Sequence, residues 1–124
     1  MALLWLFIAC GLQSADSGGE PLCKHDPPLT YENFGKGYLD MHCNGCHSSL
    51  AEGDHRVGAP DSVNLDTYNW VLDWVERIDA RATGEMPTMP PGGGPTPDEV
   101  AKLEEWLYCT VYSDRDIYME QQGQ

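Results

Sequence analysis

The residues best suited to chemistry in this 124-residue chain are Cys43, Cys46 and His47, which stand in the pattern C-x-x-C-H. This pattern attaches a c-type haem to a protein. Its two thiols add across the haem vinyl groups, and the two-residue spacer lets both sulfurs reach one edge of the macrocycle. The histidine that follows then lies under the iron as its proximal ligand. The stretch therefore predicts one covalently bound haem c.

A C-x-x-C pair alone would also suit a redox dithiol or one half of a zinc site. The chain has no second C-x-x-C to complete a zinc site. The other segments supply what a haem domain needs, so haem attachment is favoured over both alternatives.

Length and charge narrow the class of protein. A chain of 124 residues holds at most one domain with tails. Its 20 acidic residues against 7 basic ones give a formal net charge of -13. Such a chain repels nucleic acid and attracts partners with basic docking surfaces. We therefore expect protein redox partners and no nucleic acid.

The N-terminus predicts export. Residues 1–9 are almost wholly apolar but too short to span a bilayer, as in the apolar region of a secretory signal. Together with Cys10 they resemble a bacterial lipobox, in which a lipid is added to the cysteine after cleavage; a plain cleaved signal and an uncleaved anchor are the alternatives. Residues 10–29 then form a tether. All three interpretations place the domain outside the cytoplasm, and we expect the periplasmic side of a bacterial membrane, with a lipid anchor.

The cysteine count predicts one disulfide. If Cys10 carries lipid and the C-x-x-C-H pair carries haem, Cys23 and Cys109 remain out of five cysteines. An oxidising compartment favours their pairing, which would close a long loop and stabilise the fold by about 4–5 kcal/mol in the chain-entropy model. The alternative is two free buried thiols.

Three helices are predicted from capping residues and from apolar side chains at helical spacing. They span about 30–43, 68–82 and 97–109. The expected N-caps are Thr30 for the first, Asp66 or Thr67 for the second, and Thr96 for the third, where Pro97 and Glu99 complete a capping box.

Glycine and proline mark the irregular segments. Gly35 and Gly37 each weaken the first helix by about 1 kcal/mol, and we expect them to permit close approach of another helix. Residues 48–65 form a loop. The stretch 84–97 holds five prolines and four glycines, which predicts a stiff irregular loop. Residues 110–124 are polar and without period, and are expected to form a flexible tail.

The order of these elements resembles a class I cytochrome c, in particular the single-haem domains of exported or lipid-anchored bacterial proteins. The resemblance covers residues 30–109. Besides C-x-x-C-H, it rests on the segments Arg56-Val57-Gly58-Ala59-Pro60, Val63-Asn64-Leu65-Asp66-Thr67-Tyr68 and Met89-Pro90-Pro91-Gly92-Gly93. It implies an all-α fold of three or more helices around one haem, with a methionine as sixth iron ligand before the last helix.

Met89 is the favoured sixth ligand, since Met-Pro-Pro followed by glycines best matches the family pattern. Met86 is the alternative, and an open or otherwise ligated site is a third possibility. Pro60 lies at a suitable distance past His47 to offer its carbonyl to the second imidazole nitrogen. Candidate partners for the haem propionates are Arg56, Tyr68 and Trp70. His42 is expected to be a solvated or packing residue.

These residues predict a carrier of single electrons and not an enzyme, because an iron with two protein ligands has no open position for a substrate. A haem enzyme or sensor with a labile sixth ligand, acting on peroxide or a small gas, is the second hypothesis. A structural lipoprotein with a non-redox haem or a dithiol is the third.

Overall fold

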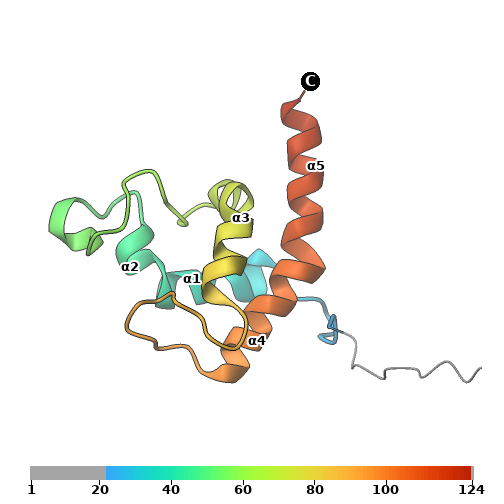
Figure 1. Ribbon diagram of the computed structural model, residues 1–124. Coiled ribbons are helices and arrows are strands. Elements are labelled where there is room, and N and C mark those ends of the chain that lie inside the picture. The colour runs from blue at the N-terminus through green and yellow to red at the C-terminus, as the bar shows by residue number, and fades with distance from the viewer. Residues whose placement is uncertain (1–21, 124) are drawn as a thin grey trace, which may run out of the picture.

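Helices joined by loops make up all of the described chain, residues 22–123, in the computed structural model (Figure 1). No β-strand occurs in this range, so the predicted all-α class is confirmed. The predicted signal peptide, lipidated Cys10 and most of the tether lie outside the described residues. Within them, no helix is both long and apolar enough to cross a membrane.

The first predicted helix begins after Thr30. Thr30 Oγ1 accepts a hydrogen bond from the backbone N–H of Asn33 at 3.1 Å, and Asn33 Oδ1 accepts from the N–H of Thr30 at 2.7 Å. This reciprocal cap satisfies two N–H groups that a helix start leaves unpaired. The segment runs as a π-helical turn, η1 (Tyr31–Gly35), and then as α1 (Lys36–His42).

Gly35 allows the first helix to lie against α4 (Pro97–Trp106). A Cβ at this position would overlap the indole ring of Trp106, which is fully buried. Close helix contact was expected at both glycines, but it occurs only at Gly35, because a Cβ at Gly37 would meet open space. The rings of Tyr31, Phe34 and Tyr68 surround the same indole.

The second long helix, α3 (Tyr68–Ala82), matches its predicted span. Of the two candidate caps, Thr67 is the one used: its hydroxyl accepts from the N–H of Trp70 at 3.4 Å. One face of α3 is buried through Val71, Val75 and Ile78. These side chains belong to a single core, completed by Tyr38, Leu39, Leu65, Leu72, Ala82, Leu103, Trp106, Leu107 and Val111.

The C-terminal segment is helical far beyond its predicted end. The Thr96–Glu99 capping box starts α4 (Pro97–Trp106) as expected. The chain then continues through a π-helical turn, η3 (Leu107–Val111), into α5 (Tyr112–Gln122), whose C-terminal end projects beyond the other helices (Figure 1). The prediction of a flexible tail is therefore wrong for residues 110–122, which are helical.

Contacts with α3 explain why this polar segment is helical. Tyr68 donates its hydroxyl hydrogen to Asp114 at 2.6 Å, and Tyr112 donates to Asp79 at 2.8 Å. Arg115 pairs with Glu76 at 2.8 Å. Polar pairs between neighbouring helices leave no apolar stripe in the sequence, so periodicity alone did not predict α5.

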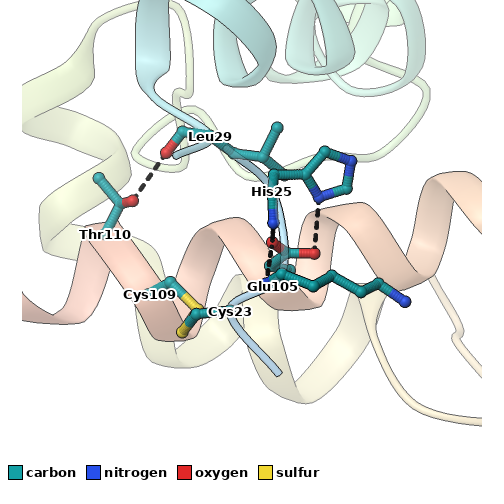
Figure 2. Close-up of a disulfide and its surroundings, with 7 residues drawn as sticks. Cys23, His25, Leu29, Glu105, Cys109 and Thr110 are labelled. Atoms are coloured by element: carbon teal, nitrogen blue, oxygen red, sulfur yellow. Dashed lines mark hydrogen bonds and ion pairs between the residues drawn. A yellow bond between two sulfur atoms is a disulfide. The ribbon is translucent and has the colours of Figure 1, made fainter. Parts of the chain in front are cut away.

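The segment that precedes the first helix, residues 22–29, is fastened to α4 and η3 (Figure 2). Cys23 and Cys109 form the predicted disulfide, with their Cα atoms 5.8 Å apart. Thr110 donates its hydroxyl hydrogen to the carbonyl of Leu29 at 2.7 Å. The end of the expected tether, from residue 22 to 29, is thus part of the folded domain.

Glu105 is the polar centre of this attachment (Figure 2). It is 3% exposed and accepts hydrogen bonds from the backbone N–H groups of Lys24 at 2.9 Å and His25 at 2.7 Å. The His25 ring donates through Nδ1 at 2.8 Å, because a carboxylate oxygen can only accept. Burial by itself would raise the pKa of the Glu105 carboxyl, but these hydrogen bonds outweigh it and hold that pKa below its usual range.

Replacement of this carboxylate should therefore destabilise the fold in a pH-dependent manner. Because the pKa of Glu105 is lower in the folded than in the unfolded chain, its contribution is full at neutral pH. It is lost as the pH falls below about 4, through the folded-state pKa. We expect Glu105→Gln to reduce the free energy of unfolding by about 1–3 kcal/mol at pH 7, measured by urea denaturation with the disulfide intact.

The neighbouring Glu104→Gln is the matched control and should change stability by less than about 0.5 kcal/mol. The difference between the two variants should shrink at pH 3. A difference that stays constant from pH 7 to pH 3 would show that the charge of Glu105 does not contribute.

Candidate functional site

Two long loops, residues 48–67 and 83–96, occupy the same side of α3 (Figure 1). A cavity of about 580 Å³ lies between these loops and α3. Its walls include seven of the residues singled out in the sequence: His42, Cys43, Cys46, His47, Arg56, Pro60 and Met89. Apolar side chains contribute most of the remaining wall, among them Val57, Val63, Leu65, Trp74 and Ile78. The volume falls within the roughly 300–1,000 Å³ typical of sites for small molecules and cofactors.

The ring of His47 is oriented by a backbone carbonyl. His47 ends the short helix α2 (Asn44–His47), and its Nδ1 lies 3.0 Å from the carbonyl oxygen of Val63. A carbonyl can only accept, so Nδ1 carries the hydrogen and Nε2 keeps its lone pair for a metal. The prediction that the carbonyl of Pro60 accepts from the His47 ring is wrong. That carbonyl accepts from Arg56 Nη2 instead, at 2.7 Å. Pro60 remains a residue of the cavity wall.

The two cysteines of C-x-x-C-H are not bonded to each other. Burial, and to a lesser extent the neighbouring Cys46, raises the pKa of the Cys43 thiol to about 12. At neutral pH this cysteine is therefore a thiol. Disulfide exchange uses the thiolate, so the surroundings of Cys43 disfavour a redox dithiol.

Of the two candidate methionines, Met89 lies on the cavity wall, and Met86 does not. Met86 is 89% exposed, whereas Met89 is 38% exposed. The backbone N–H groups of Thr88 and Met89 donate to the carbonyl of Arg81, at 2.8 and 2.9 Å. This carbonyl belongs to the last turn of α3, where helix carbonyls lack partners within the helix. The end of α3 therefore fixes where Met89 enters the wall.

Arg56 does not have the role expected of it. It ends the short helix η2 (Gly53–Arg56) and is 3% exposed. Its guanidinium and Nε donate to oxygens of the surrounding loop: the carbonyls of Ser48, Ala51, Ala59, Pro60 and Val63, and Oδ1 of Asn64. Since its N–H groups are already engaged, Arg56 organises the loop and is not free to bind a propionate.

Tyr68 and Trp70 do not line the cavity either. The hydroxyl of Tyr68 donates to Asp114, and its ring stacks on Tyr31 at a centroid distance of 4.9 Å. The tryptophan on the cavity wall is Trp74. Both corrections follow from the rotation of α3, which turns Trp74 and Ile78 towards the cavity.

His42 is a packing residue, as expected, but it packs at the cavity. Its side chain is 12% exposed and its ring lies 4.9 Å from that of Tyr38, centroid to centroid. Nε2 of His42 lies 3.6 Å from Glu99 Oε1, which exceeds hydrogen-bond distance. Within the described residues, this buried nitrogen has no hydrogen-bond partner.

Two functional features were missed in the sequence. The carbonyl of Val63 has no side-chain signature, so no residue pattern could have identified it. Arg77 and Arg81 also lie on the wall. The sequence did carry a signal for these two arginines: they are four residues apart, so they share one side of the helix, next to the apolar Trp74 and Ile78.

The chain's donor set fits a covalently attached haem. Two thiols, an imidazole with Nε2 free, a thioether and a mostly apolar wall are brought to one cavity. Comparisons with protein-family models, curated proteins and solved structures found no match.

Loss of the Arg56 guanidinium should loosen the loop that orients His47. Lysine keeps the charge but has a single nitrogen, so it cannot reach the same set of carbonyls. We expect Arg56→Lys to lower the free energy of unfolding by about 2–4 kcal/mol, measured by urea denaturation followed by circular dichroism. Arg115→Lys, which alters the half-exposed pair with Glu76, is the control and should cost less than about 1 kcal/mol. Equal effects in the two variants would contradict the role of Arg56.

Proposed function

We propose that this protein carries single electrons with one c-type haem attached through Cys43 and Cys46. The observation that carries the proposal is the meeting of Cys43, Cys46, His47 and Met89 on one cavity wall, although Met89 is more than 40 residues away along the chain. Chance would not be expected to bring this methionine to the C-x-x-C-H motif. The proposal includes a cytochrome c fold for residues 30–109.

Each of these residues has a defined task. Cys43 and Cys46 fix the cofactor, and Val63 holds His47 with Nε2 available as the proximal ligand. Met89, placed by the carbonyl of Arg81, would offer its thioether sulfur as the second protein ligand of the iron. A bound haem supplies an iron that alternates between the ferric and ferrous states.

The apolar wall and the axial pair suit electron transfer. A histidine–methionine pair raises the reduction potential relative to two stronger donors. A mostly apolar wall would leave few polar groups to reorient around a bound haem when the iron changes oxidation state. The chain therefore contributes ligands, burial and orientation, and no catalytic group of its own.

The setting of the carrier follows from charge and from the N-terminus. Because the chain has a formal net charge of -13, we infer redox partners that have basic docking surfaces and bind transiently. We also propose that the protein is exported and held by lipid on Cys10 at the periplasmic side of a bacterial membrane.

A second candidate is a haem enzyme or sensor in which the methionine leaves the iron. One observation favours it: the Met89 side chain is 38% exposed, so a small molecule can reach it from solvent. If the thioether left the iron, peroxide or a small gas could take its place. The two candidates differ in whether the iron keeps its sixth ligand in both oxidation states.

The experiment that separates them is redox titration of the exported protein followed by optical spectroscopy. We expect one reversible one-electron transition, a low-spin spectrum, and the weak absorption near the red edge that reports a methionine–iron bond. Met89→Ala should abolish that band and lower the potential, because a ligand that favours ferrous iron is lost.

Met86→Ala is the matched control, since Met86 is also followed by proline but lies outside the cavity wall. It should leave both the band and the potential unchanged. The reverse result would transfer the ligand role to Met86. A high-spin wild-type protein that binds added carbon monoxide or cyanide at once would support the enzyme or sensor.

A further inference from the structure

Cationic residues are concentrated at the cavity. The chain has only 7 basic residues against 20 acidic ones, yet three of its arginines, Arg56, Arg77 and Arg81, line this one cavity. An anion would be repelled over most of such a surface. The cavity therefore offers an anionic group three positive charges in one place.

Arg77 and Arg81 differ from Arg56 in being available. Arg56 is buried and bonded to its loop, whereas both α3 arginines are exposed. Among residues 22–123, neither guanidinium makes a hydrogen bond or an ion pair, in contrast to Arg115, which pairs with Glu76. Each can therefore offer a bidentate pair of donors to a carboxylate.

Their spacing suits two anionic groups on one edge of a ligand. Residues four apart lie on the same side of a helix, about 6 Å apart along its axis. On the adjacent strip of the same helix, Trp74 and Ile78 also face the cavity. The α3 wall thus pairs an apolar strip with a cationic strip, which matches a flat apolar molecule that carries two carboxylates on one edge.

We propose that Arg77 and Arg81 bind the two haem propionates and thereby set the reduction potential. This inference rests on the proposed function and replaces Arg56, Tyr68 and Trp70 in that role. Two positive charges beside the ring disfavour the ferric state, which carries one more positive charge than the ferrous state. They also keep both propionates ionised, since an arginine beside a carboxyl lowers its pKa by about 1–3 units.

The test is the midpoint potential of haem-loaded Arg77→Gln and Arg81→Gln, measured from pH 5 to pH 9. We expect each variant to have a lower potential than the wild type. The pH range over which the potential changes should also move upward by about 1–3 units, because propionates without an arginine lose their protons at higher pH. Arg77→Lys and Arg81→Lys keep the charge and should restore most of both properties.

Lys102→Gln removes the same charge from α4 outside the cavity wall, and should leave the potential and its pH range unchanged. The methionine–iron band serves as a check that the Arg81 variants leave the Met89 loop in place. Apart from the motif residues and the arginines, the titratable side chain on this wall is His42. Measurements in a His42→Gln background remove its contribution.

The outcomes separate the two proposals. If the wild type carries haem and both glutamine variants behave like Lys102→Gln, the propionate role is wrong and the electron carrier stands. If only one variant shifts, a single arginine binds, and the paired site is wrong. A wild-type protein without haem would overturn the proposed function itself.

Discussion

The buried guanidinium of Arg56 organises the loop on which the candidate iron ligand depends. Its donors hold backbone oxygens on both sides of the loop, and Val63 is shared: its carbonyl accepts from Arg56 Nη2 and from His47 Nδ1, each at 3.0 Å. A carbonyl oxygen has two lone pairs, so both bonds can form at once. Because the Arg56 side chain is removed from water, an incomplete set of partners would be costly. The loop is therefore held in the conformation that presents Nε2 to the cavity.

The helices provide the rest of the positioning. Gly35 permits the first helix to contact Trp106. The Cys23–Cys109 disulfide and the hydrogen bonds to Glu105 together fasten residues 22–29 to α4 and η3. These contacts hold the start of the helix that leads into the C-x-x-C-H motif. In the same cavity, α3 supplies the apolar strip and, through the Arg81 carbonyl, the position of Met89. Two segments far apart in the sequence thus line one cavity.

The sequence predicted those features that depend on local interactions. The caps at Thr30, Thr67 and Thr96 and the span of α3 follow from side chains within a few residues of each other, and the disulfide follows from the cysteine count. The predictions that failed concern features that depend on the path of the chain in space. Which carbonyl meets His47 is decided by the way Arg56 folds its loop, so Val63 could not be told from Pro60. Helix α5 depends on polar pairs with α3, such as Tyr68 with Asp114, and these have no periodic signature.

The central claim is that one haem is attached covalently through Cys43 and Cys46, and the intact mass of the denatured, exported protein tests it most directly. We expect the wild type to exceed the mass of its mature polypeptide by one haem, besides any lipid. A Cys43→Ala, Cys46→Ala protein should lack that increment. A wild-type mass with no haem, with both thiols open to alkylation, would contradict the account.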